Sequence, residues 1–183
     1  MPSRPTDDVR VVSSSVAFFR NLNLGQRRSR SPTRPQLLEA FAQAGATSTV
    51  SFQTNGTVIF ESGRRSPQRL ADRAVELLTP VCGYDDMAIA RPVDWLLREL
   101  DLEQVPDHAE VSFFDGPDPF PEGLPWAAPR GGLVVVRADS RHAVSVNDLE
   151  GSSGATWVLE DRLGVKVTSR GVPTMRRLLV KLA

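Results

Sequence analysis

A short alternating pattern around residue 55 constrains the fold more than any other feature of the sequence. Val50 and Phe52 alternate with polar residues before it, and Val58 and Phe60 alternate in the same way after it, with Asn55-Gly56 in between. Asn-Gly is typical of a type I′ turn, because both central residues of that turn need positive φ. The pattern predicts two antiparallel strands joined by a tight turn, each with one apolar face.

A helix start signal lies on each side of this hairpin. Thr33 and Gln36 have the spacing of a capping box, and Ser66-Pro67 combines a good N-cap with a proline at the first helical position. The first helix is expected to stop at Gly45, and the second before Pro80. With strands expected at about 11–19 and 86–90, the order becomes β-α-β-β-α-β, which is the ferredoxin-like arrangement.

The second half of the chain shows the same order of elements. After a connecting helix at 92–100, the sequence predicts strands at about 110–114, 133–136, 143–146 and 165–169, and helices at 153–163 and from 173 onward. Five prolines in 115–129 make any helix there short and irregular. The expected fold class is therefore α+β, a tandem pair of ferredoxin-like units with antiparallel sheets and a C-terminal helix. The expected parts are a disordered tail (1–9), a first unit with its connecting helix (10–100), a linker (101–107) and a second unit (108–183).

Composition excludes several classes of protein. No apolar run approaches the ~20 residues of a membrane helix, and the N-terminus lacks the apolar stretch of a secretory signal. A single cysteine, Cys82, excludes an internal disulfide and a cysteine-based zinc cage. The expectation is a cytoplasmic protein with no membrane partner, no metal and no cofactor.

Charge is unevenly distributed although the net charge is zero. Residues 1–84 carry a net charge of +5, residues 85–161 a net charge of −11, and residues 162–183 a net charge of +6. Such asymmetry can produce a segregated binding face, or the oppositely charged parts can pack together and neutralise one another, which we favour. Twenty of the 22 basic residues are arginine, a side chain suited to phosphate contacts but also enriched by a GC-rich genome.

The expected topology brings several polar residues to one edge of the first unit. Strands 1 and 2 run in the same direction, so the end of strand 1, the start of helix 1 and the hairpin tip lie together, and helix N–H groups there favour an anion. Arg170 and Thr174 could be added from the second unit. The candidate anion-binding residues are Arg20, Asn23, Arg27, Arg28, Gln53, Thr54, Asn55, Arg170 and Thr174. The alternative is a loop held by its own hydrogen bonds, with Asn23 and Gln53 as turn residues.

Other candidate sites are weaker. His108 and His142 have no second ligand at metal spacing, and Asp115 with Asp118 is only a faint indication of a cation site. Cys82 follows a helix C-terminus and is expected to pack rather than react. The three tryptophans are expected in the core or between the units. No catalytic residue can be named.

The sequence also resembles a known family at three places. Residues 16–25 are similar to the opening motif of the domain-of-unknown-function family 1697, usually Phe-Leu-Arg-Gly-Ile-Asn-Val-Gly-Gly. Residues 51–60 are similar to its second motif, usually Gln-Ser-Gly-Asn followed by Val-Val-Phe. Residues 163–174 are similar to its third, usually Thr-Thr-Arg-Asn-Trp-Asn-Thr. The resemblance implies a paired ferredoxin-like fold and no established biochemical function.

The chain departs from these motifs at several positions. Asn21 and Gln26 replace glycines, Thr54-Asn55-Gly56 replaces Ser-Gly-Asn, Gly171-Val172-Pro173 replaces Asn-Trp-Asn, and Gly151-Ser152-Ser153 stands where members often have Arg-Ser-Lys. If the motif residues form the family's site, these changes imply an altered or lost activity.

Three functions are compatible with the sequence. The favoured one is a binding module for a phosphate-bearing ligand or partner. Nonspecific nucleic-acid contact is left open but not favoured, because the chain lacks the aromatic strand of RNA-binding ferredoxin-like domains. The alternatives are an enzyme acting on a small anionic substrate at the strand-1 edge, and an interaction protein that forms a homodimer through a sheet edge.

Overall fold

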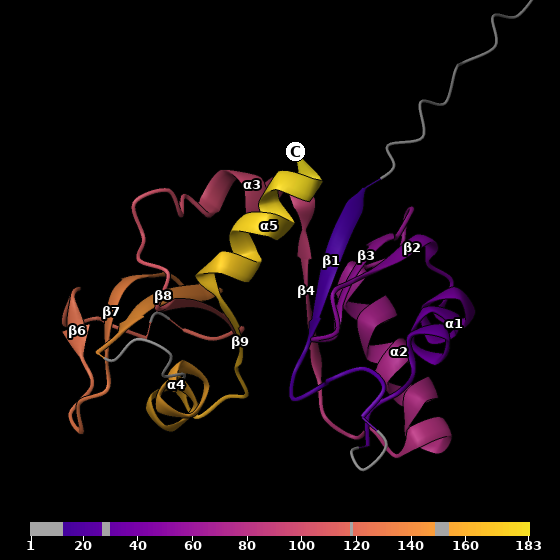
Figure 1. Cartoon of the computed structure of the whole chain (residues 1–183), viewed down its shortest axis with the longest axis horizontal. Helices are drawn as coiled ribbons and strands as arrows, with labels where there is room; N and C mark the ends of the chain where they lie inside the picture. Colours follow the sequence, from indigo (N-terminus) through magenta and orange to yellow (C-terminus); the bar gives the residue numbers. More distant parts are fainter. Residues whose placement is uncertain (1–12, 27–29, 118, 149–153) are drawn as a thin grey trace, which may run out of the picture.

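The computed structural model describes residues 13–26, 30–117, 119–148 and 154–183, which form nine strands and five helices (Figure 1). The protein is α+β with two antiparallel sheets. The first has four strands in the order β2-β3-β1-β4, and the second has five in the order β6-β7-β8-β5-β9. The expected tail, together with Arg27 and Arg28, Asp118 and the Gly151-Ser152-Ser153 segment, lies outside the described residues.

The first half follows the predicted order of elements. It contains β1 (Ser14–Phe19), α1 (Arg34–Ala44), β2 (Thr47–Phe52), β3 (Thr57–Glu61), α2 (Pro67–Cys82), β4 (Ala88–Pro92) and α3 (Val93–Glu99). The capping box at Thr33 is confirmed, because its side chain accepts from the Gln36 backbone while the Gln36 side chain accepts from the Thr33 backbone. Ser66 caps α2 as predicted.

Two local predictions in this half are wrong. Helix α2 continues past Pro80 to Cys82, so the proline lies inside the last turn of the helix. The hairpin turn is also not type I′, since its left-handed residues are Gln53 (φ 58°) and Gly56 (φ 67°) rather than Asn55 and Gly56. At Gly56 an added Cβ would lie 2.8 Å from the Phe19 Cβ, so glycine allows the hairpin tip to contact the end of β1.

The second half contains β5 (Ala109–Phe113), β6 (Trp126–Ala127), β7 (Leu133–Ala138), β8 (His142–Asn147), α4 (Ala155–Leu163), β9 (Thr168–Gly171) and α5 (Val172–Leu182). The described part of the proline-rich stretch forms no helix, and β6 pairs with β7 at its end. The last strand starts three residues later than predicted, which places Arg170 within it.

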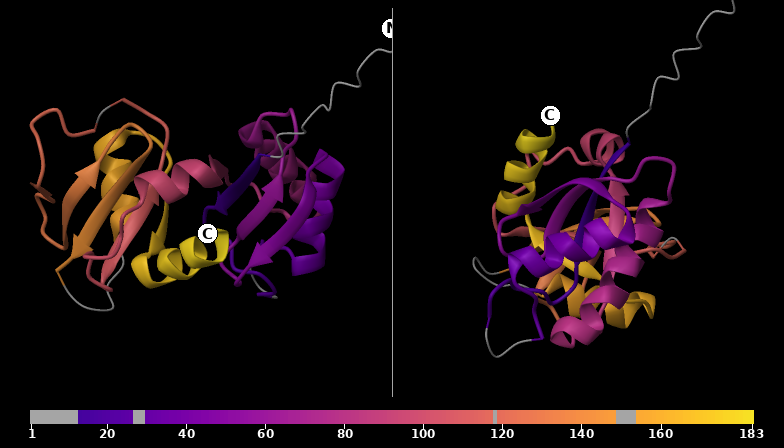
Figure 2. Two further views of the ribbon diagram at one scale, coloured as in Figure 1. Left: turned by 90° about the horizontal axis from the view of Figure 1, so that it is seen from above. Right: turned by 90° about the vertical axis from the view of Figure 1, so that its right-hand side faces the viewer.

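Three apolar clusters hold the layers together. One lies between the first sheet and its two helices α1 and α2, and includes Phe19, Phe41 and Phe60. A second fills the space between the two halves, with α3 and α5, and the Phe18 and Phe113 rings stack there at 4.3 Å. The third lies between the second sheet and α4. Figures 1 and 2 show α1 and α2 on the outer side of the first sheet and α5 between the halves.

The apolar run of β1 is explained by this arrangement. Ala17 and Phe19 face the α1–α2 cluster, whereas Val16 and Phe18 face the cluster between the halves, and all four are fully buried. A strand covered on both faces loses the polar alternation that a half-exposed strand shows. The halves are therefore joined by a shared apolar core as well as by the chain connection.

Candidate functional site

The hairpin tip, the end of β1 and the start of α1 do lie together. The Phe19 N–H donates to Gly56 O (2.9 Å), the Leu24 N–H donates to Thr54 O (2.8 Å), and the Arg34 guanidinium donates to Gln53 O (3.1 Å). Asn23 and Thr54 are exposed at this edge. The topology thus places these elements as expected. Whether this edge can bind an anion depends on what its arginines already contact.

Arg20 is occupied by carboxylates from both halves of the protein. Its guanidinium contacts Asp86 at 2.7 Å and Glu160 at 2.8 and 2.9 Å, and it also donates to the Val167 carbonyl. Partial burial opposes the charge, but the two carboxylates outweigh it and raise the pKa of Arg20. An incoming anion would have to compete with two carboxylates that are already in place.

Arg170 is buried, with 8 % of its surface exposed. It donates to Phe19 O (2.8 Å), Asn55 O (2.8 Å) and Thr57 Oγ1 (3.3 Å) in the first half, and its guanidinium lies over the Phe18 ring. Burial lowers the pKa of Arg170 to about 10, with Tyr84 acting weakly in the opposite direction. Its donors thus join β9 to β1 and the hairpin.

The remaining residues of the predicted edge form smaller contacts. In the orientation that satisfies both its oxygen and its nitrogen, the Gln53 amide accepts from Arg177 Nε at 3.1 Å. Thr174 accepts from the same arginine at 3.2 Å, and Asn55 accepts from the Thr57 hydroxyl at 2.9 Å. The predicted edge is therefore closed largely by contacts within the protein.

A third arginine completes the connection between the halves. Arg91 of β4, 5 % exposed, donates to Phe114 O (2.6 Å), to Arg141 O (3.1 Å) and to the Asp115 carboxylate (2.9 Å). Burial lowers the pKa of Arg91, and Asp115 partly opposes this. Lys166 adds an ion pair to Asp86 at 3.0 Å. Oppositely charged segments thus meet where the halves join, which agrees with the neutralising interpretation of the charge asymmetry.

Two of the weaker candidate residues, His142 and Cys82, form contacts within the fold. His142 is buried, and its Nδ1 lies 3.0 Å from Asp139, whereas the Cys82 thiol lies 3.4 Å from the Leu78 carbonyl of its own helix. Among the described residues no three His, Cys, Asp or Glu side chains gather in a way that could hold a metal ion. Of the helices in the described ranges, none is long and apolar enough to cross a membrane.

The edge of β4 is closed to another strand. The Gln68 side-chain amide donates to Ala88 O (2.8 Å) and accepts from the Ala90 N–H (2.9 Å), as a neighbouring strand would. Arg91 Nη1 donates to Ala90 O at 3.0 Å, and Pro92 has no N–H to offer. At the opposite edge, β2 is irregular between Thr47 and Val50. Bulges and blocked groups of this kind oppose pairing between sheet edges.

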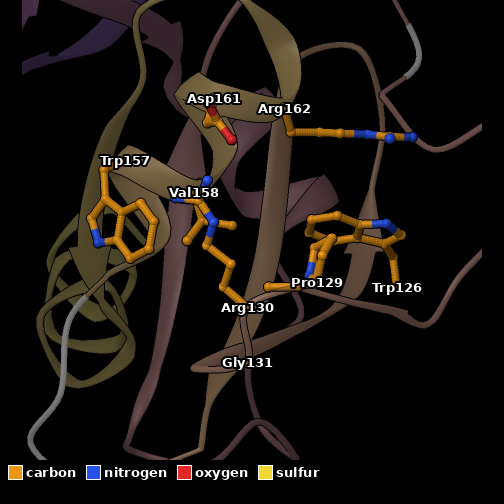
Figure 3. Close-up of a pocket in the computed structure, with 9 residues that line it drawn as sticks. Trp126, Pro129, Arg130, Gly131, Trp157, Val158, Asp161 and Arg162 are labelled. Atoms are coloured by element: carbon orange, nitrogen blue, oxygen red, sulfur yellow. The ribbon is translucent and has the colours of Figure 1, made fainter.

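A pocket with a cavity volume of about 310 Å³ lies in the second half, between α4 and the turn that joins β6 to β7 (Figure 3). Its size is at the lower end of the range for small-molecule sites. The wall is mixed apolar, aromatic and charged, and the lining residues are Trp126, Ala128, Pro129, Arg130, Gly131, Trp157, Val158, Asp161 and Arg162.

One wall of this pocket is a hydrogen-bonded turn that carries Arg130. The Gly131 N–H donates to Ala128 O at 2.9 Å, with Pro129 and Arg130 as the central residues of the turn. The next residue, Gly132, donates to the Asp148 carboxylate at 2.8 Å. Gly131 (φ 71°) and Gly132 (φ 94°) adopt left-handed backbone that other residues rarely reach. Arg130 lies on this turn, and its side chain extends towards α4 (Figure 3).

The opposite wall is the face of α4 that carries Trp157 and Asp161. These residues are four positions apart, so their side chains are neighbours on one face of the helix. Trp157 is 55 % exposed, which contradicts its predicted place in the core or between the units. An added Cβ at Gly154 would approach the indole Nε1 to 3.1 Å, so the ring lies against the backbone at the start of α4.

The floor of the pocket is held by Arg162. Its guanidinium pairs with Glu122 at 2.5 Å, donates to Pro119 O at 3.2 Å, and lies over the Trp126 ring at 5.4 Å from its centroid. This residue therefore ties the segment before β6 to α4, and its charge is neutralised locally. By contrast, no described carboxylate forms an ion pair with Arg130.

Sequence reasoning missed this pocket. The Pro-Arg-Gly-Gly run at 129–132 does signal a tight turn, and Trp157 with Asp161 has helical spacing. Nothing in either pattern shows that the turn and the helix face one another, because that depends on the packing of α4 on the second sheet.

Comparison with known proteins identifies a family and a similar fold. A family model described as "Protein of unknown function (DUF1697)" matches residues 12–119, which is more than half of the chain. The chain belongs to the DUF1697 family. A solved structure, that of the conserved bacterial protein SP0830 from Streptococcus pneumoniae, is similar over 93 % of this chain and 98 % of that chain, with a TM-score of 0.65 and 14 % identity. That likeness concerns the fold. None of the curated proteins matches.

The region matched by the DUF1697 model ends before the pocket. It contains the whole first sheet, with Arg20, Gln53 and Asn55, and also β5. Arg130, Trp157 and Asp161 lie beyond residue 119. The edge rich in motif residues and the pocket are therefore two different places, and in this DUF1697 member the arginines at the edge connect the halves.

Proposed function

We propose that this protein is a binding module for a small anionic, phosphate-bearing ligand, held in the pocket between α4 and the β6–β7 turn. One observation carries the proposal: Arg130 forms no ion pair with a described carboxylate and lies on the β6–β7 turn opposite the half-exposed ring of Trp157. An arginine fork matches the geometry of phosphate or carboxylate oxygens. The indole ring offers a flat apolar surface for the rest of the ligand.

The pocket is favoured over the strand-1 edge because of what each arginine already contacts. Arg20 is paired with two carboxylates and Arg170 is buried among carbonyl oxygens, so an anion at the edge would have to break contacts between the halves. Binding at Arg130 requires no such rearrangement.

The test is a fluorescence and thermal-shift screen of the purified chain against nucleotides, sugar phosphates and polyphosphate, at low and high salt. Trp126 and Trp157 line the pocket, whereas Trp95 is buried elsewhere. A change in tryptophan emission on addition of a ligand therefore reports mainly on the pocket. A ligand present at 100 times its dissociation constant adds about 2.7 kcal/mol of stability, which raises Tm by about 5–11 °C for a chain of this size.

Two variants locate the binding. Arg130→Ala and Trp157→Ala are expected to abolish the shift, whereas Arg69→Ala, which removes an exposed arginine on α2, keeps it. If no compound in the screen shifts Tm, or if Arg130→Ala binds like the unaltered protein, the pocket is not an anion site.

We also infer that the two halves are a tandem pair of ferredoxin-like units, with the boundaries 10–100 and 108–183. The support is the strand order, which is β4-β1-β3-β2 in the first sheet and β9-β5-β8-β7 in the second, with β6 added at the edge. Both sheets thus place their first strand between the third and the fourth, as a βαββαβ unit does.

A further inference from the structure

Asp161 constrains the ligand more sharply than Arg130 does. Its carboxylate lines the same pocket, and Figure 3 shows it beside Arg162, on the side towards which the Arg130 side chain extends. A ligand that carried only negative charge would be repelled by this group. A ligand that offers N–H donors to Asp161 while its anion contacts Arg130 satisfies both groups, because a carboxylate can only accept hydrogen bonds.

The spacing on α4 shows where those donors have to lie. Trp157 and Asp161 are one helical turn apart, so a flat ring stacked on the indole has its edge within reach of the carboxylate. Two carboxylate oxygens match two adjacent N–H groups on such an edge, in the way that they match an arginine fork. Among nucleobases, guanine carries this pair, as its ring N1–H beside its N2 amino group.

The opposite wall and the size of the pocket also limit which ligand can bind. The Arg130 side chain starts from the β6–β7 turn and extends towards α4, so its guanidinium can bind a phosphate attached to the base through a sugar. A volume of about 310 Å³ is at the lower end of the range for small-molecule sites, which favours a mononucleotide over a larger ligand. Arg162 is neutralised by Glu122 and supports Trp126, so it does not add a second anion contact.

We propose, building on the function proposed above, that the pocket binds a mononucleotide with a guanine-type base. The base stacks on Trp157 and donates to Asp161, and its phosphate binds Arg130. Trp157 supplies affinity for any flat ring, Asp161 supplies the choice of base, and Arg130 supplies the preference for the phosphorylated form.

The test compares GMP, AMP and guanosine by calorimetric titration against the full chain. GMP is expected to bind at least tenfold more tightly than AMP, because only guanine offers two adjacent N–H donors to the Asp161 carboxylate. Asp161→Asn is expected to remove that preference. Arg130→Ala is expected to make GMP bind no better than guanosine. Asp94→Asn, on the exposed side of α3, is the matched control and should leave the ranking unchanged.

The outcomes separate this inference from the function on which it rests. If AMP or a sugar phosphate binds as tightly as GMP, and Asp161→Asn leaves the ranking unchanged, the guanine inference is overturned while the anion site stands. The guanine inference is likewise overturned if an aromatic amino acid binds and mononucleotides do not. If Arg130→Ala has no effect on any ligand, both are overturned.

Discussion

The two sheets share a strand order and differ in how their outer faces are covered. In the first half α1 and α2 lie side by side and cover one face of the sheet. In the second half α4 covers its face alone, since the chain between β5 and β7 contains only the two-residue strand β6 in its described part. Prolines oppose a helix in that segment. The pocket lies beside α4, on a face that one helix covers where two helices cover the corresponding face of the first sheet.

The halves also differ in how their helices begin. Thr33 and Ser66 cap α1 and α2 from within the same segment. At α4 the N-cap is Gly154, which has no side chain, and Glu110 of β5 accepts from the backbone N–H groups of Gly154 (3.1 Å) and Ala155 (3.2 Å) instead. The starts of α1 and α2 are thus capped locally, whereas the start of α4 depends on an acceptor from a distant strand.

The largest effect is expected from a substitution that removes the contacts between the two halves. Arg170→Ala removes the donors that reach Phe19, Asn55 and Thr57 and leaves buried carbonyls without partners. We expect the free energy of unfolding to fall by about 3 kcal/mol or more, and Tm to fall by about 6–12 °C. Urea unfolding measures the first and a thermal scan the second.

The exposed Arg69→Ala on α2, away from the junction, serves as the control for that experiment, with an expected loss below about 0.5 kcal/mol. If Arg170→Ala is no more harmful than Arg69→Ala, the junction does not depend on the buried arginine. Two separate unfolding transitions in the Arg170 variant would show that the halves are cooperative only through this contact.

The contrast between local and distant capping predicts a smaller difference. Glu110→Ala leaves the start of α4 without an acceptor and exposes the Asn147 amide that Glu110 also contacts, so we expect a loss of about 2 kcal/mol. Thr33→Ala removes an exposed local cap and should cost about 1 kcal/mol. Urea unfolding of both variants compares them. Equal losses would mean that Glu110 acts as an ordinary cap.

Lowering the pH should produce the smallest change in stability. It tests the ion pairs of Asp86 at the junction between the halves. Burial alone would raise the pKa of Asp86, but hydrogen bonds and attraction from Arg20 and Lys166 outweigh it and lower the pKa. A carboxylate with a lowered folded-state pKa stabilises the protein above its unfolded value of about 3.9, and this contribution is lost as pH falls through the folded value. Asp86→Asn should therefore be less stable at pH 6 and lose less stability by pH 3. Parallel stability curves for the two proteins would contradict this assignment.

Local signals in the sequence were enough to determine the order of elements and much of the first unit. The capping residues Thr33 and Ser66 and the alternation around the hairpin report on neighbours a few positions away, which is the range over which helix and strand periodicity acts. Pro80 and the hairpin turn were misjudged, because packing tolerates a proline in a last helical turn and decides which turn residues become left-handed.

Only the tertiary structure decided what the charged residues do. Whether Arg20 and Arg170 are free to bind an anion depends on Glu160 and Phe19, which lie about 140 and 150 positions away from them in the chain. Whether Arg130 faces Trp157 depends on how α4 packs on the second sheet. The partner of a side chain is set by the packing of whole elements, and a sequence pattern that repeats every two or four residues carries no record of it.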